Sequence, residues 1–150
     1  MSLFLAMETA IVEQLEARFA DMSPKPRVYT STEIGNIKDQ SQGDLNVFVA
    51  YNGIIAAEPQ APNVKHIGMI TNQWLIWVVA RSSRGQRNSG DGIRELADPV
   101  LERVIESLMG QKLLKEYEAL TITDTIPPAY GDGFGYFPLA FNARKTVRGK

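Results

Sequence analysis

The sequence predicts an α+β fold: a mostly antiparallel sheet of about four to five strands, packed against two main helices in one domain, residues 1–150. Three observations support this expectation. Two segments carry apolar residues at helical spacing, long apolar strand candidates occupy the middle of the chain, and the connections between successive strands are short. Short connections favour antiparallel pairing, because parallel strands need a long crossover.

The first helix is expected from about Leu3 to Asp21. Four apolar residues recur there at four-residue steps and would form one buried stripe: Met7, Ile11, Leu15 and Phe19. The helix should end at the segment SPKP, because neither proline can continue it. A short strand, RVYTST, is expected next.

Two longer strands are expected in the middle of the chain. LNVFVAY alternates, with Leu45, Val47, Val49 and Tyr51 on one face, and EPQAPN should end the strand. The other strand is expected from about Lys65 to Arg81. Its second half, WLIWVVA, is apolar on both faces and places Trp74 and Trp77 on opposite sides. Such a strand is either covered on both sides or in contact with another subunit.

A second helix is expected after a polar loop, with a wide apolar stripe that starts at Ile93. Asp91 is a candidate N-cap, because its carboxylate can accept hydrogen bonds from the first-turn amides. Pro99 leaves two possibilities: the helix kinks there, or Asp98 is the true cap and Pro99 takes the first helical position. Gly110 suits the end of the helix.

Two closing strands are expected, at ALTITDT and FGYFPLAFNARKTV. Pro138 in the second argues for an edge strand or a bulge, because proline has no N–H for the ladder. PPAYGDG between them is rich in turn residues. The glycines of YGDGFGYF suit a hairpin turn better than a dinucleotide-binding fingerprint, since Tyr136 takes the third glycine position and no helix follows.

The composition is that of a globular protein, 44% hydrophobic and 22% charged. No apolar run approaches the ~20 residues that cross a bilayer. The start, MSLFLAME, lacks the basic region and cleavage site of a signal peptide. The chain contains no cysteine, which excludes disulfides, thiolate metal sites and cysteine nucleophiles. We therefore expect a cytoplasmic protein without membrane association.

The loop RSSRGQRNSGDG follows a strand and opens a helix, as a phosphate-binding loop does. Gly85 and Gly90 have the P-loop spacing, but Asp91 and Gly92 stand where that motif needs lysine and a hydroxyl. An aspartate there would repel phosphate. We interpret residues 82–90 as an exposed basic loop that becomes ordered against a partner.

The sequence contains no set of residues that combines nucleophile, base and oxyanion donors. His66 is the only histidine, so neither a histidine metal site nor a catalytic triad is expected. Asp98 and Glu102 lie one helical turn apart and suit a solvated face better than a metal site. The sequence therefore predicts a protein that is not an enzyme and needs no cofactor or metal.

The net charge is −1, but the basic residues are unevenly placed. Seven of the 16 lie in two clusters: Arg81, Arg84 and Arg87, and then Arg144, Lys145, Arg148 and Lys150. This asymmetry suits contact with an acidic surface or nucleic acid, and a solvated loop and a frayed tail explain it equally well.

Taken in order, these elements resemble the small tail-terminator, or tail-completion, proteins of Mu-like and lambda-like phages and prophages. Almost the whole chain carries the resemblance, through METAIVEQLEARF, LNVFVAYNG, TNQWLIWVVARS, the variable glycine-rich loop, GIRELADPVLERVIESLMG and YFPLAFNARKTV. It implies a structural protein that forms a hexameric ring on the tail tube, halts tube polymerisation and presents a surface to head or neck proteins. It also implies assembly in the host cytoplasm and a final place in the virion tail.

A closed ring of identical subunits needs two different, complementary patches. The candidate subunit or tube contacts are Leu3, Phe4, Leu5, Trp74, Trp77, Arg81, Arg84 and Arg87. The expected partners are further copies of the chain, the tail tube protein, head or neck proteins, and DNA that passes through the lumen without sequence reading. The resemblance supplies no active-site residues.

Three alternatives stay open at this stage. In the first, the chain is another neck, tube or baseplate subunit. In the second, it is a small regulatory or nucleic-acid-binding module that uses Arg84, Arg87 and the carboxyl-terminal basic cluster. A weaker third alternative is an enzyme with an unfamiliar site.

Overall fold

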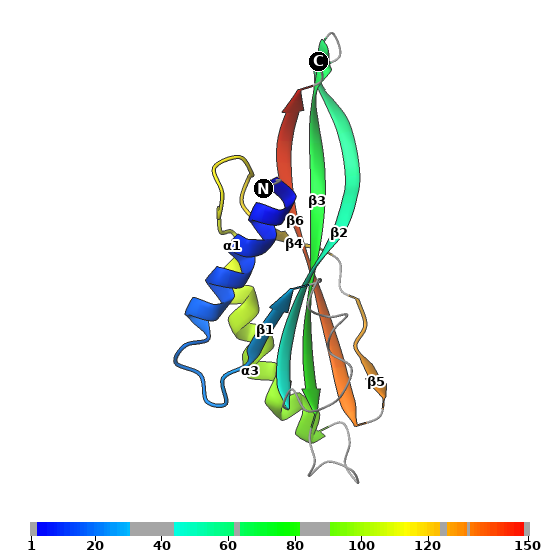
Figure 1. Ribbon diagram of the computed structural model, residues 1–150. Helices are drawn as coiled ribbons and strands as arrows, with labels where there is room; N and C mark the ends of the chain where they lie inside the picture. The colour runs from blue at the N-terminus through cyan, green and yellow to red at the C-terminus, as the bar shows by residue number, and fades with distance from the viewer. Residues whose placement is uncertain are drawn as a thin grey trace.

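The computed structural model describes residues 3–30, 44–61, 64–81, 91–123, 126–131 and 133–148. Two helices cover one face of a six-stranded, mostly antiparallel sheet, which confirms the predicted α+β class (Figure 1). The elements are α1 (Leu3–Arg18), β1 (Arg27–Thr30), β2 (Leu45–Ala61), β3 (Val64–Arg81), α3 (Asp91–Leu108), β4 (Thr121–Ile122), β5 (Ala129–Gly131) and β6 (Phe134–Arg148). No helix within these ranges is long and apolar enough to cross a membrane.

The sheet has the order β1-β2-β3-β6-β4, and β5 also pairs with β6. Only β1 is parallel to its neighbour; all other pairs are antiparallel. β3 lies at the centre, and its pairing with β6 runs without a register shift from Ile67 opposite Arg148 to Arg81 opposite Phe134. This continuous ladder extends over the whole of β6.

The three longest strands extend beyond the helical layer (Figure 1). α1 begins beside the middle of β2, and β2, β3 and β6 continue past it. We call the part of the sheet formed by residues 53–58, 68–72 and 143–148 the arm, and the helix-covered remainder the body. The chain thus uses the same three strands in two different environments.

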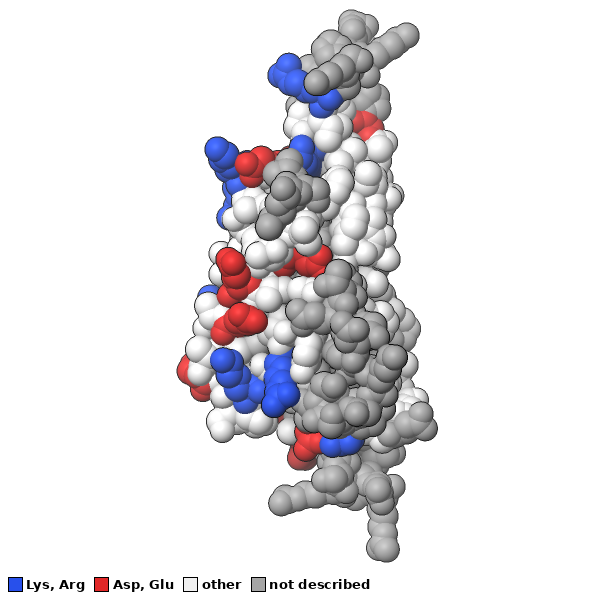
Figure 2. All heavy atoms as spheres, in the orientation of Figure 1, with Lys and Arg blue, Asp and Glu red and all other residues white. Residues whose placement is uncertain are grey.

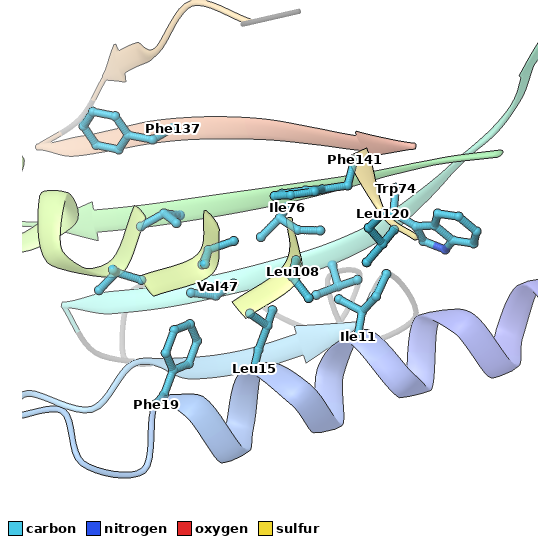
Figure 3. Close-up of a cluster of buried hydrophobic side chains, with 14 of the residues drawn as sticks. Ile11, Leu15, Phe19, Val47, Trp74, Ile76, Leu108, Leu120, Phe137 and Phe141 are labelled. Atoms are coloured by element: carbon cyan, nitrogen blue, oxygen red, sulfur yellow. The ribbon is translucent and has the colours of Figure 1, made fainter. Parts of the chain in front are cut away.

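The core lies between the helices and one face of the body (Figure 3). The four predicted side chains of α1, from Met7 to Phe19, are all buried, which confirms the helical stripe. α3 contributes Ile93, Ala97, Val100, Val104 and Leu108. The sheet contributes Val47 and Val49 from β2, Trp74, Ile76 and Val78 from β3, and Phe137 and Phe141 from β6.

β2 is longer than expected. EPQAPN was predicted to end this strand, yet it pairs with β3 as far as Ala61. Register shifts between Tyr51 and Gly53, Ile54 and Ala56, and Pro59 and Ala61 let the strand pass its glycine and proline. Gly53 has a φ of 101°, a conformation that favours glycine. Bulges therefore absorb the residues that look like strand breakers in the sequence.

α3 is one helix that runs through Pro99. The alternative in which Asp98 caps a shorter helix is wrong, because the helix begins at Asp91 and Asp98 lies inside it. Ile93 and Ala97 before the proline are buried in the same core as Val100 after it, so packing holds both halves together. Gly110, with a φ of 76°, follows the helix as predicted.

β6 lies inside the sheet and shows no register shift against β3, so the bulge expected at Pro138 is wrong. At Pro138 itself, however, the described strands pair with β6 on one side only, as at a sheet edge. Pro138 pairs with Trp77 of β3 on one side. On the other side it lies between β5, whose pairing ends at Tyr136, and β4, whose pairing starts at Phe141. A residue without an N–H is tolerated at such an interruption. β5 lies in the segment PPAYGDG, where only a turn was expected. It forms the predicted hairpin with β6, and Gly133 in this hairpin has a φ of 81°.

Candidate assembly surfaces

The start of α1 lies against the sheet. The Phe4 ring stacks on Tyr51 with 5.3 Å between centroids, so Phe4 is used largely within the subunit. Leu5 is 45% exposed and faces the surface, as its predicted contact role requires. The Leu3 side chain lies outside the described residues.

Trp74 is wholly buried and does not fit its predicted role as a contact residue. Its ring lies 5.4 Å from Tyr51 and 5.8 Å from Tyr117, centre to centre. The sequence pattern placed the two tryptophans on opposite faces, which is confirmed, but it did not reveal which face the helices cover. Trp74 is the core residue, and Trp77 lies half-buried on the other face.

The face of the body that carries Trp77 is apolar, with half-buried side chains on β2 and β3 and buried ones on β6. Phe48, Trp77 and Pro138 form one row across β2, β3 and β6, and Ala50, Leu75 and Ala140 form the next. Towards the arm, side-chain amides replace apolar groups. Asn52 Nδ2 donates to Gln73 Oε1 at 2.7 Å, and Gln73 Nε2 donates to Asn142 Oδ1 at 3.1 Å. This amide row marks the boundary between body and arm on that face.

Arg81, at the end of β3, is held within the subunit. It donates to Asp44 at 3.0 Å, and its guanidinium lies 5.6 Å from the Phe134 ring centre. Arg84, Arg87 and the loop of residues 82–90 lie outside the described residues, so their predicted contact role stays a prediction.

The arm combines exposed apolar and basic side chains. Ile54 is 54% exposed and Ile55 is 45% exposed. Arg144 contacts Glu58 at 3.2 Å and Glu118 at 3.9 Å. Lys145 and Arg148 follow on the same strand, where residues 143–148 include no acid.

The helical layer carries the opposite charge. α1 and α3 together contain eight acidic and three basic residues. Glu95, Asp98, Glu102 and Glu106 are all exposed along one side of α3. Figure 2 shows acidic side chains over the middle of the body, basic ones below them, and basic side chains towards the tip of the arm with an acidic one beside it.

A hollow of about 420 Å³ lies where the end of α1 meets α3. It is lined by Ala17, Arg18, Ala20, Asp21, Arg103 and Glu106. Arg103 bridges the two helices, because its Nη1 donates to Asp21 Oδ1 at 2.7 Å and to the Arg18 carbonyl at 2.6 Å. Hydrogen bonding and charge from Arg103 hold the pKa of Asp21 below its ordinary value. The hollow therefore contains a structural ion pair.

The buried polar groups also serve the fold. Tyr51 Oη donates to Asn72 Oδ1 at 2.5 Å at the base of the arm. Burial, with smaller contributions from Tyr51 and Glu116, raises the pKa of Tyr117 to about 12. Within the described ranges, no group of three or more His, Asp or Glu side chains could hold a metal ion. The Tyr51–Asn72 hydrogen bond therefore joins β2 to β3 where body and arm meet.

Sequence reasoning missed the arm residues Ile54 and Ile55. The available signal was two adjacent isoleucines directly after Gly53, in a segment whose alternation had just ended. Adjacent apolar residues in a strand point to opposite faces unless a bulge intervenes. A bulge at this point was not deducible from composition.

Comparisons with known proteins agree with this fold. A family model described as "Phage tail terminator protein" matches residues 1–150. No curated protein gives a match to the sequence. A solved chain of a "Virion of native gene transfer agent (GTA) particle" is 15% identical, with a TM-score of 0.58, over 95% of this chain and 94% of that chain. A second solved structure, whose name states no function, is 16% identical, with a TM-score of 0.52, over 100% of this chain and 99% of that chain.

The two structural similarities establish the shared fold, and the family match establishes the kinship. The match extends over all the elements described above and agrees with the resemblance found in the sequence. The chain belongs to the phage tail terminator protein family and is a structural, non-enzymatic component of a phage-type tail.

Proposed function

We propose that the chain forms a closed ring on the end of the tail tube, stops further polymerisation and presents a joining surface to head or neck proteins. The observation that carries this proposal is the presence of two unlike surfaces on one subunit. The arm is apolar and basic, whereas the helical layer is acidic. A head-to-tail contact between such surfaces closes into a ring when the rotation allows it.

The body supports this role, because a capping subunit must keep its shape when it binds. Its core is shared by both helices and three long strands. Proteins with pre-organised interfaces bind with little backbone movement. The body thus provides a rigid base on which the two contact surfaces are carried.

The proposal is tested by adding the purified chain to tail tube protein during polymerisation and measuring tube lengths by electron microscopy. A capping protein shortens the tubes in proportion to its concentration and is found at tube ends. Incorporation along the tube would instead identify a tube subunit. Tubes of unchanged length with bare ends would contradict the proposal.

A similarity to a virion chain of a gene transfer agent is consistent with a role in such particles. DNA in the lumen, tube protein and neck proteins are the partners that this role requires. Of the basic residues available to DNA, Arg144 already contacts two carboxylates within the subunit. Arg144 is therefore less available to DNA than the sequence alone indicates.

A further inference from the structure

The arm continues the sheet face that the helices cover in the body. On β3, Asn72 and Ile70 follow Trp74 on that face. In the neighbouring strands, Ile54 of β2 pairs with Asn72, and Lys145 of β6 pairs with Ile70, so both lie on the same face. Ile54 is exposed and Ile70 is half-buried, whereas their counterparts in the body are fully buried. The apolar face therefore extends past its own cover.

The arm also has open edges within the described part of the chain. β1 pairs with β2 only as far as Val49. On the other edge, the last backbone contact to β6 runs from the Glu118 amide to the Arg144 carbonyl. A three-stranded sheet is stable when its apolar face is packed against another element. Asn72 and Ala143 at the base of the arm are still buried, but beyond them no described element covers this face in the way that α1 and α3 cover the body.

We propose that the arm packs against the acidic helical layer of a second copy of this chain. Charge complementarity identifies this occupant, because the arm carries Lys145 on this face and Arg148 at the end of β6, and α3 presents an acidic side. Ile54 and Ile70 supply the apolar centre of the contact, and the charges set its orientation. Since the arm and the helical layer are different surfaces, the contact is head-to-tail.

This inference rests on the proposed ring and specifies its subunit contact. Two pairs of substitutions test it in the full chain. The arm variant carries Lys145→Glu and Arg148→Glu, and the helix variant carries Glu95→Lys and Glu102→Lys. Lys25→Glu with Arg27→Glu is the matched control for the arm variant, since it makes the same charge change at exposed positions just before and at the start of β1.

Assembly is measured by mass photometry across a concentration series, and folding by circular dichroism. Each reversed variant should need at least about tenfold more protein to assemble, because like charges then face each other. An equimolar mixture of the two variants should assemble like the wild type, since each contact then joins opposite charges. Ile54→Ser changes an exposed side chain and leaves the core intact. It should weaken assembly of the wild type, of each reversed variant and of their mixture.

Assembly of the arm variant at wild-type concentrations would overturn the inference, as would failure of the mixture to recover. Either result leaves the capping proposal standing if the wild type still shortens tubes. A wild type that stays monomeric both alone and at tube ends would overturn both proposals.

Discussion

The body and the arm use the same three strands, yet among the described residues helices cover the body and not the arm. Ile76 in β3 is fully buried under the helical layer, whereas Ile54 in β2 is mostly exposed. Strand pairing alone does not distinguish the two regions, because the β3–β6 register is continuous through both. The difference therefore lies in packing, and it separates residues that stabilise the subunit from residues available for assembly.

The largest expected effect comes from truncating the body. Ile76→Ala should lower the free energy of unfolding by about 2–5 kcal/mol, because it removes buried methyl groups and leaves a cavity. Denaturant unfolding followed by circular dichroism gives this value. A loss below about 0.5 kcal/mol, the range of ordinary surface changes, would mean that the helical layer does not cover β3.

A substitution of a glycine in the body should have the next largest effect. In Gly135→Ala, the new Cβ would lie 2.5 Å from Ile93 Cγ2 and 2.8 Å from a Phe137 ring carbon. Overpacking of this kind costs about 1–3 kcal/mol. Gly131→Ala, where no atom lies within 4 Å, is the control and should unfold like the wild type. Equal stabilities of the two variants would contradict the close approach of α3 and β6.

The junction between body and arm should respond to alkaline pH. Because burial raises the pKa of Tyr117 to about 12, the neutral phenol is favoured in the folded state. Its contribution to stability is fully present below the ordinary tyrosine pKa of about 10. It is lost as the pH rises through the folded value. As the pH rises between these two pKa values, the free energy of unfolding should therefore fall less for Tyr117→Phe than for the wild type. Parallel stability curves would contradict the burial of this phenol.

An acid-dependent effect is expected at the α1–α3 contact. Arg103 lowers the pKa of Asp21, so this pair stabilises the fold above the ordinary aspartate pKa and stops doing so as the pH falls through the lowered value. Asp21→Asn should reduce the melting temperature slightly at neutral pH and not at strongly acidic pH. The effect should be small, because Asp21 is exposed. A difference in melting temperature that does not change with pH would mean that packing, and not the ion pair, causes the effect of the substitution.

The arm should give the smallest effect on the isolated subunit. Ile54→Ala removes the same chemical groups as Ile76→Ala, yet it should change the free energy of unfolding by less than about 0.5 kcal/mol. The pair of variants compares the two regions directly under identical denaturant conditions. Similar losses in both would show that the arm face is packed within the subunit.

Most of the fold could be predicted because its signals are local. The apolar residues from Met7 to Phe19 recur at helical spacing, the second half of β3 is apolar, and Gly110 follows the end of α3. Prediction failed where distant contacts override local preference. Pro99 stays inside a helix because residues on both sides of it share a core, and β2 passes Pro59 because bulges preserve its ladder.

The assembly surfaces were harder to predict for the same reason. Both tryptophans look alike in the sequence, and only the position of the helices makes Trp74 a core residue and Trp77 a residue of the opposite face. Leu5 remains a candidate contact, whereas the isoleucines of the arm were not identified. Exposure depends on which elements cover a strand, and periodicity does not contain that information.

Hydrogen exchange of the free and assembled chain tests the contrast between body and arm most directly. On assembly, backbone amides of residues 53–58 and 68–72 should become more protected, because the arm gains a covering element. Amides of residues 74–80 should keep the protection that they already have in the free subunit. Unchanged protection in the arm, with assembly verified in the same sample, would contradict the account.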